Sequence, residues 1–463
     1  MFYPVLFIVQ SFSLCYNIKI CCVFLLHEAH RPFPARSLQG CLMLIQVHME
    51  KERITMQFYI DPGTGSMLFT ILVGVLSAGI YALRGFFMKL RFWFTGGSKV
   101  AVDENRLPFV IFADDKRYWN TFGPICDEFE RRGQALTYMT ASPNDPALEK
   151  HYEHVKCEFI GEGNKAFAKL NMLRADLVLS TTPGLDVYQW KRSKDVKWYA
   201  HVLHAPSDPT VYRMFGLDYY DAVLLCGEYQ VRQQRSLEQL RNLPAKELPI
   251  VGLPYLDGLL ERLQKAQSVG EHPRTVLLAP SWGKSAIFSV YGKKMIDALL
   301  ATGYHVIIRP HPQSFTSEKD LIEGLMKDYP DSEQLEWNRD NDNFDALHRA
   351  DIMISDFSGV IFDFALVFDK PIIYADTSFD TAPYDASWLD EQPWTFGVLP
   401  RIGEKLTADK LDDMKSLIDH CLADERFSKA RQQAREETWA NMGKSVPAVV
   451  DYLMKKQEEL KTK

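Results

Sequence analysis

The chain has 463 residues, which is enough for two or three domains and more than one hydrophobic core. Its composition, 46% hydrophobic and 24% charged, is ordinary for a globular protein, and its net charge of −7 argues against a general nucleic-acid-binding surface. The eight cysteines are scattered and form no C-x-x-C pair, which argues against a disulfide scaffold or a zinc ribbon and is typical of a reducing compartment.

The first hundred residues contain a candidate membrane anchor. Residues 1–56 are predicted to be an extension of uncertain role, with Met56 as a candidate translation start. Residues 62–83 carry no charge along their whole length, and a membrane-spanning helix needs about 20 such residues. Because Arg84 and further basic residues follow at once, we expect a single anchor helix within residues 57–95, with the rest of the chain on the cytoplasmic side. A buried core helix and an interfacial hairpin are the alternatives.

From residue 105 onwards, short apolar runs alternate with amphipathic segments. This alternation predicts an α/β fold with parallel, doubly wound sheets. Residues 105–260 are expected to form a first Rossmann-like domain. Its predicted strands are residues 108–113, 135–140, 176–180, 198–203, 221–226 and 248–251, with a helix over residues 117–132.

A polar segment, residues 261–274, is predicted to link this domain to a second one over residues 275–405. The predicted strands there are residues 275–279, 304–309, 351–355 and 371–375, with a helix over residues 292–302. Residues 407–460 are predicted to be helices that pack back across the domain junction. Two such domains facing each other predict a ligand site at the carboxyl ends of their strands.

Residues 351–376, DIMISDFSGVIFDFALVFDKPIIYAD, contain the most informative motif. They predict a buried strand, a Ser-Asp-x-Ser-Gly turn, an apolar helix and a second strand. Four residues of the turn lie near a helix N-terminus, where backbone N–H groups attract anions: Ser355, Asp356, Ser358 and Gly359. The alternative is a turn that only caps the helix. Asp363, inside the apolar helix, is expected to hold a ligand hydroxyl or a cation, because an unpaired buried carboxylate is unfavourable.

Two more strand ends of the second domain carry polar residues. Residues 305–314, HVIIRPHPQS, place Arg309 and His311 on a loop that two prolines stiffen, which suits a phosphate-binding or catalytic group. Ser281 and Lys284, after the first strand of this domain, are also candidate anion contacts.

In the first domain, residues 198–208, WYAHVLHAPSD, place His204 just past a strand, where it could act as a general base or donate to a phosphate. His201 is expected to point to the opposite face and to have a packing role. Thr181 and Thr182 follow another strand end and are candidate donor or acceptor contacts.

Several common motifs are missing. The chain has no G-x-x-x-x-G-K-[ST] and no G-x-G-x-x-G sequence, which argues against a P-loop enzyme and a dinucleotide enzyme. The only D-x-D pattern in this region, at residues 340–342, lies in a polar stretch before a helix. We therefore predict neither a metal ion nor a cofactor.

The order of these motifs resembles the CDP-glycerol glycerophosphotransferase family, which includes teichoic-acid polymerases and primases. The resemblance covers roughly residues 170–400, and SDFSGVIFDF is its most specific part. It implies a glycosyltransferase-B-like fold of two Rossmann-like domains at the inner (cytoplasmic) membrane of a bacterium. The family's two important histidines fall on His204 and His311, although His204 stands in L-H-A-P-S where the family has W-H-G-T.

The resemblance implies transfer of glycerol phosphate, or a related polyol phosphate, from a CDP-activated donor to a lipid-linked or glycan acceptor, with release of CMP. His204 is favoured as the base and His311 as the phosphate binder, and the opposite split remains open. Two alternatives are a glycosyltransferase or epimerase that uses a UDP-sugar on the same fold, and a membrane scaffold with a degenerate cleft.

Overall fold

The computed structural model describes residues 20–24, 43–47, 106–340, 342–375, 377 and 379–462. The chain divides into two compact units, Met1–Asp103 and Glu104–Lys463. In the first unit, the described elements are β1 (Ile20–Phe24) and β2 (Met43–Val47), which pair antiparallel. The second unit contains both predicted α/β halves.

The expected membrane anchor, residues 57–95, lies outside the described residues. None of the helices that the structure does describe has both the length and the apolar character needed to cross a membrane. The anchor therefore stays a prediction.

The first half of the second unit is built on a six-stranded parallel sheet with the order β5-β4-β3-β6-β7-β8. Its strands are β3 (Leu107–Ala113), β4 (Leu136–Thr140), β5 (Val155–Phe159), β6 (Ala175–Ser180), β7 (Val196–Val202) and β8 (Ala222–Leu224). The central strands are apolar along almost their whole length because helices cover both faces of the sheet. Strand order reverses between β3 and β6, the position where such sheets bind ligands.

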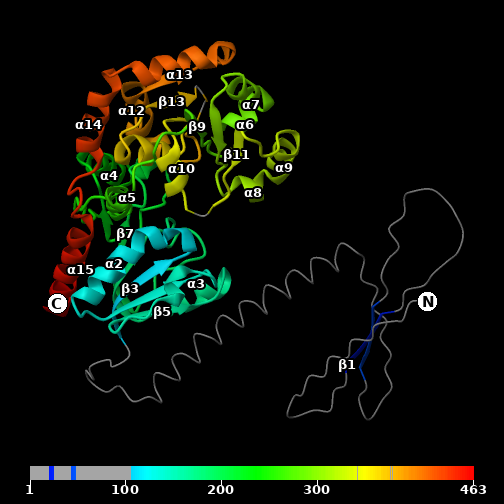
Figure 1. The fold of residues 1–463 in the computed structure, drawn as a ribbon. Coiled ribbons are helices and arrows are strands. Elements are labelled where there is room, and N and C mark those ends of the chain that lie inside the picture. The colour runs from blue at the N-terminus through cyan, green and yellow to red at the C-terminus, as the bar shows by residue number, and fades with distance from the viewer. Residues whose placement is uncertain are drawn as a thin grey trace, which may run out of the picture. The chain divides into compact units, whose positions relative to one another are not determined.

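The second half repeats this arrangement, with the strand order β11-β10-β9-β12-β13-β14 (Figure 1). Its strands are β9 (Thr275–Leu278), β10 (His305–Ile308), β11 (Leu335–Trp337), β12 (Ile352–Ser355), β13 (Ile372–Ala375) and β14 (Gly403–Leu406). Here the order reverses between β9 and β12, so the Ser-Asp-x-Ser turn follows a strand at the reversal point.

Helices connect the strands and close the chain. The α-helices are α2 (Trp119–Arg131), α3 (Asn164–Leu170), α4 (Glu228–Arg241), α5 (Pro254–Lys265), α6 (Ile287–Tyr291), α7 (Lys293–Leu300), α8 (Ser314–Ser317), α9 (Lys319–Asp328), α10 (Phe344–Arg349), α11 (Val360–Phe362), α12 (Trp394–Ile402), α13 (Met414–Ala423), α14 (Arg426–Thr438) and α15 (Ser445–Thr462). Shorter turns of 3-10 helix are η1 (Lys116–Tyr118), η2 (Pro146–Glu149), η3 (Pro209–Val211), η5 (Asp385–Trp388) and η6 (Ala408–Asp413), and η4 (Asp363–Val367) is π-helical.

The C-terminal helices return from the second half to the first. Helix α14 packs against α12 and α4, and α15 packs against α2 and α5, as Figure 1 shows for the red α15 beside the cyan α2. One continuous hydrophobic cluster runs through both halves, from Phe112 in β3 to Phe362 in α11, and Leu256 and Trp439 belong to it. The two halves therefore share a core.

The structure differs from the sequence-based prediction mainly at the sheet edges. Strands β5, β11 and β14 were not predicted, because all three carry charged residues among apolar ones. The predicted strand at residues 248–251 is limited to an isolated bridge between Ile250 and Leu225, next to a proline that has no N–H to donate. Helix α5 extends into the predicted linker as far as Lys265.

A single carboxylate connects the two halves beside the predicted site. Asp208, four residues after His204, is 2% exposed. Its carboxylate accepts the backbone N–H groups of Trp394 at 2.8 Å and Thr395 at 2.7 Å, at the first turn of α12 in the other half. It also accepts hydrogen bonds from the Thr395 hydroxyl and the Gln233 amide, each at 2.5 Å. Asp208 thus acts as an N-cap supplied from another segment of the chain.

A buried ion pair reinforces the same junction. Arg241 of α4 contacts Asp385 at 2.5 Å and Asp218 at 2.8 Å, and all three side chains are almost fully buried. Asp385 also accepts the backbone N–H of Phe215. The loop that follows His204 is therefore fixed to the second half at two places.

We expect Asp208→Ala to lower the free energy of unfolding by about 2–4 kcal/mol, because it removes a helix cap and leaves buried donors without an acceptor. Urea unfolding of the variant and the native chain measures this change. The matched control is Asp390→Ala, an exposed aspartate for which we expect little change. Equal midpoints for the two variants would show that the Asp208 cap does not stabilise the junction.

Candidate active site

A cleft of about 310 Å³ lies at the carboxyl ends of strands from both sheets. The loops after β3 and β7 of the first half and after β9, β10 and β12 of the second half line it. Six of the residues singled out from the sequence line this cleft: His204, Arg309, His311, Ser358, Gly359 and Asp363. Segments as far apart in sequence as residues 204 and 363 therefore meet at one place.

The Ser-Asp-x-Ser turn has a base beneath the cleft surface and a rim that lines the cleft. Ser355 is fully buried, and its hydroxyl donates to the backbone carbonyl of Ala279 at 2.6 Å. This bond ties the end of β12 to the end of β9. The structure places Ser355 beneath the cleft surface, whereas the sequence analysis expected it to contact phosphate.

Asp356 also lies beneath the surface, with 1% of its area exposed. Its carboxylate accepts the backbone N–H groups of Ser281 at 2.8 Å, Ile287 at 3.0 Å and Ser358 at 3.2 Å. Burial raises the pKa of Asp356 to about 6, and these three hydrogen bonds oppose that rise. Asp356 therefore holds the loop after β9 against the turn, and Ser281 takes part through its backbone.

Ser358 and Gly359 form the rim of the turn and line the cleft. Gly359 directly precedes α11, which continues into the π-helical η4. A Cβ atom added at Gly359 would lie 3.8 Å from the Cβ atom of Ala205, so the turn touches the His204 loop across the junction. Backbone N–H groups at such a helix start are suited to an anionic ligand.

His311 has a defined tautomer. The backbone N–H of Gln313 donates to its Nδ1 atom at 3.0 Å. A backbone amide nitrogen cannot accept a hydrogen bond, so Nδ1 is unprotonated and the neutral ring carries its proton on Nε2. Burial and, to a lesser extent, the charges of Arg117 and Arg309 lower the pKa of His311 to about 4. His311 is therefore a neutral hydrogen-bond donor at neutral pH.

The Nδ1 atom of His204 faces a hydroxyl group, whereas that of His311 faces a backbone N–H group. In His204, this atom lies 2.8 Å from the hydroxyl oxygen of Thr181, which can either donate or accept. Its ring packs against Tyr118, with the ring centroids 4.9 Å apart. Burial and the charge of Arg117 lower the pKa of His204 to about 4, so this ring is also neutral. His201 is fully buried within β7, away from the cleft lining.

Asp363 is the buried carboxylate of the cleft wall, 5% exposed, at the first position of η4. Its Oδ2 atom accepts from the Tyr255 hydroxyl at 2.9 Å and from the Asn343 amide at 3.4 Å. Burial raises the pKa of Asp363 to about 7, and these two hydrogen bonds only partly offset it. A carboxyl group with such a pKa can both accept from and donate to a ligand hydroxyl near neutral pH.

The remaining predicted residues lie outside the cleft surface. Thr181 is fully buried behind His204, and the Thr182 hydroxyl donates to Asp114 at 2.8 Å. Lys284 is exposed on the loop between β9 and α6 and does not line the cleft.

Among the cleft residues that sequence reasoning missed, three act on the predicted ones: Arg117, Tyr255 and Asn343. Arg117 lies in the loop after β3 and lowers the pKa of both histidines, which places its charge near each of them. Its sequence signal was the charged run Asp114–Arg117 directly after the first strand of the sheet. Tyr255 and Asn343 had no such signal, because only their contacts with Asp363 identify them. Asp363 lies about 110 residues from Tyr255 and 20 residues from Asn343 in the sequence.

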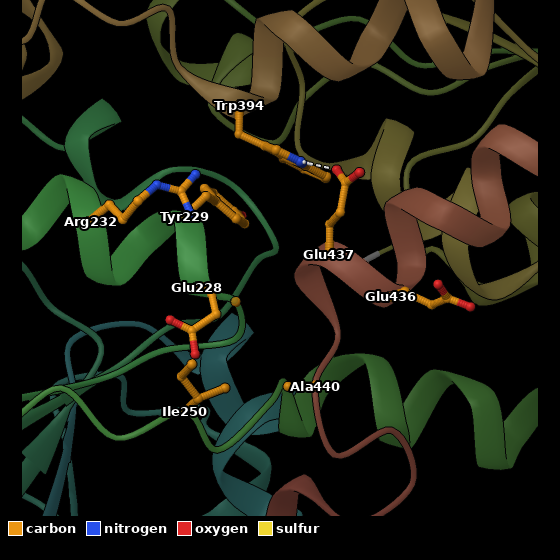
Figure 2. A pocket seen from close by; sticks show the side chains of 9 residues that line it. Glu228, Tyr229, Arg232, Ile250, Trp394, Glu436, Glu437 and Ala440 are labelled. Carbon is orange, nitrogen blue, oxygen red and sulfur yellow. Dashed lines mark hydrogen bonds between the residues drawn. The ribbon is translucent and has the colours of Figure 1, made fainter.

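A second pocket, of about 410 Å³, lies between α4, α12 and α14. Figure 2 shows its aromatic wall, in which Trp394 and Tyr229 stack with centroids 5.0 Å apart, and Glu437 accepts from the Trp394 indole at 2.8 Å. Neither cleft histidine lines this pocket. Within the part of the chain that the structure describes, no group of three or more His, Cys, Asp or Glu residues could hold a metal ion.

Solved structures support the fold. The chain is similar to a UDP-N-acetylglucosamine 2-epimerase, described as putative in its title, from Listeria monocytogenes, with 13% identity over 76% of this chain and 97% of that one, at a TM-score of 0.50. It is also similar to the S. aureus protein MnaA in a structure with UDP, with 12% identity over 77% of this chain and 98% of that one, at a TM-score of 0.50. At this identity the likeness shows the fold alone: two Rossmann-like halves of the glycosyltransferase-B kind.

No curated protein matches the sequence significantly. A family model, CDP-glycerol:poly(glycerophosphate) glycerophosphotransferase, matches residues 231–397. This match includes His311, the Ser-Asp-x-Ser turn and Asp363, and it begins after His204. The predicted resemblance is thus confirmed over residues 231–397, and the enzyme is a transferase of the CDP-glycerol glycerophosphotransferase type.

Proposed function

We propose that this enzyme transfers glycerol phosphate, or a related polyol phosphate, from a CDP-activated donor to a hydroxyl group of a lipid-linked or glycan acceptor. The observation that carries the proposal is the pair of neutral histidines on opposite halves of one cleft. His311 presents an N–H group next to the rim of an anion-binding turn, and His204 faces it from the first half. The family match supports a CDP-activated donor.

In the proposed reaction, the acceptor hydroxyl oxygen attacks the β-phosphorus of the donor in line with the bridging oxygen. The new oxygen–phosphorus bond forms while the bond to the bridging oxygen breaks, and CMP leaves with that oxygen. His204 takes the proton of the acceptor hydroxyl on its Nε2 atom. This nitrogen can be unprotonated, because the other ring nitrogen, Nδ1, faces the Thr181 hydroxyl, which can accept a hydrogen bond. His311, Arg309 and the Ser358–Gly359 rim stabilise charge on the phosphates.

Two further side chains contribute to the proposed site. Arg117 adds a positive charge from the first half, near both histidines, where charge develops on the transferred phosphoryl group. Asp363, with Tyr255 and Asn343, is positioned to bind hydroxyl groups of the polyol. The expected anchor within residues 57–95 would span a bacterial inner membrane and hold the cleft on the cytoplasmic side, close to a lipid-linked acceptor. The charge-free run of residues 62–83 supports this part of the proposal.

We expect the purified full-length protein to release CMP from CDP-glycerol or CDP-ribitol when a membrane extract supplies the acceptor. His311→Ala should abolish this release, since it removes the donor to the phosphates. His151→Ala, on the exposed surface of the first half, is the control and should keep full activity. Consumption of UDP-sugars alone would replace the proposal with a glycosyltransferase or epimerase on the same fold.

Substitutions of the two histidines should change different kinetic parameters. We expect His204→Gln to lower kcat by about 10²- to 10⁴-fold with little change in donor KM, as for loss of a general base. His311→Gln should raise donor KM as well, because it weakens binding of the donor phosphates. Since the pKa of His204 is lowered to about 4, the native kcat should stay constant above about pH 5 with respect to this group and should fall below that pH. The opposite division of effects would exchange the two roles.

Asp363→Asn should lower transfer activity and raise stability at alkaline pH. With a folded pKa of about 7, against an ordinary value of 3.8, the folded state binds more protons than the unfolded state between these pH values. Native stability therefore falls as pH rises through this window, and the asparagine variant avoids the loss, by at most about 4 kcal/mol. Urea unfolding at pH 5 and pH 8 measures the difference, with Asp390→Asn as the control. If the free energies of unfolding of Asp363→Asn and the native chain differed by the same amount at pH 5 and at pH 8, the raised pKa of Asp363 would be contradicted.

A further inference from the structure

A chain of buried polar groups extends behind His204, away from the cleft. The hydroxyl oxygen of Thr181 lies 2.8 Å from Nδ1 of His204. Burial raises the pKa of Tyr212, and Thr181 lowers it to a smaller extent, which places the two hydroxyl groups near each other. The Tyr212 hydroxyl lies 3.4 Å from Nε2 of His201. Thr181 and His201 are both fully buried. The groups thus form the sequence His204, Thr181, Tyr212, His201.

Each hydroxyl of this chain has one proton, so the direction of one hydrogen bond fixes the direction of the others. In one direction, Nδ1–H of His204 donates to Thr181, Thr181 donates to Tyr212, and Tyr212 donates to Nε2 of His201. Nε2 of His204 is then unprotonated and faces the cleft. In the other direction every bond reverses, and His204 presents an N–H group to the cleft.

The charge of the cleft favours the first direction. Arg117 lines the cleft on the side of His204, and its positive charge attracts a nitrogen lone pair and repels an N–H group. His201 can end the chain as a neutral acceptor. In this direction the proton of His201 lies on its other ring nitrogen, Nδ1, which is buried and has no hydrogen-bond partner among the described residues. The charge of Arg117 has to outweigh the cost of that unpaired N–H group.

His311 provides the contrast. Its Nδ1 faces a backbone N–H, which can only donate, so its tautomer is fixed with the proton on Nε2. Only the histidine backed by a hydroxyl can present an unprotonated Nε2 to the cleft. The two halves of the cleft therefore set the protonation of their histidines by different second partners.

We propose that Thr181 and Tyr212 are positioning residues that hold His204 as the Nδ1–H tautomer, with Nε2 ready to take the proton of the acceptor hydroxyl. This inference rests on the proposed function, because it assigns the second partners of the proposed base. Thr181 and Tyr212 act through His204 and lie behind its ring, and the sequence analysis had instead expected Thr181 to contact the donor or acceptor.

The test compares Thr181→Val, which removes the hydroxyl group at nearly constant shape, with Thr181→Ser, which keeps it. The control is Thr210→Val, another fully buried threonine, whose hydroxyl has no hydrogen-bond partner among the described residues. We expect Thr181→Val to lower kcat about 100-fold with little change in donor KM, and Thr181→Ser to restore most of the activity. Tyr212→Phe should also lower kcat, and Thr210→Val should not.

A long-range ¹H–¹⁵N correlation spectrum of the full-length, ¹⁵N-histidine-labelled protein reports the tautomers directly. Loss of a signal in His204→Gln and in His311→Gln assigns the two rings. We expect the Nδ1–H tautomer for His204, the Nε2–H tautomer for His311, and a shift of His204 towards Nε2–H in Thr181→Val.

Two results of the spectrum would overturn the inference: an Nε2–H tautomer of His204 in the native protein, or a His204 signal that Thr181→Val leaves unchanged. A loss of kcat in Thr181→Val that serine does not restore would also overturn it, because such a loss reflects packing. The spectrum is recorded without substrate, so it decides the positioning of His204 separately from the CMP-release assay, which decides the proposed function.

Discussion

The site depends on one interaction across the junction, the cap that Asp208 provides to α12. His204 and Asp208 belong to the same loop, and α12 belongs to the opposite half. The cap therefore fixes the distance between the first-half histidine and the second-half turn, which meet where Ala205 lies beside Gly359. Without such a connection, two separate sheets would present their strand ends to each other with no fixed geometry, and in-line transfer needs a fixed geometry.

The connection also explains why two nearby histidines can have different roles. Both rings are neutral at pH 7, because both are buried and both lie near cationic groups. Their difference comes from the second nitrogen, which meets a backbone amide in His311 and a threonine hydroxyl in His204. A neutral donor on one side and a neutral acceptor on the other suit a reaction that moves one proton away from a hydroxyl group and adds charge to a phosphate.

Much of the fold could be predicted from the sequence, because the central strands are continuous apolar runs that end in Gly, Pro or hydroxyl residues. The runs before Arg309 and Ser355 are of this kind, and both strands were predicted in place. The edge strands β5 and β11 were missed, since an edge strand is short and half-exposed, and its pattern resembles a loop.

The sequence predicted which loops form the site. It did not predict how deeply each side chain of these loops is buried. Ser355 and Ser358 stand three residues apart in one turn, yet one is tied to a buried carbonyl and the other lines the cleft. Asp363 was singled out because a buried carboxylate needs a partner, but its partners Tyr255 and Asn343 come from other elements and follow only from the packing of both halves. Short-range patterns indicate which strand ends carry polar groups, and long-range packing decides which of these groups face the ligand.

A crystal structure of the full-length protein with CDP-glycerol tests the central claim most directly. The account predicts the two donor phosphates between the Ser358–Gly359 rim and Nε2 of His311, with the β-phosphorus open to attack from the side of His204. A nucleotide bound elsewhere, for example against the Trp394–Tyr229 wall of the second pocket (Figure 2), would contradict it.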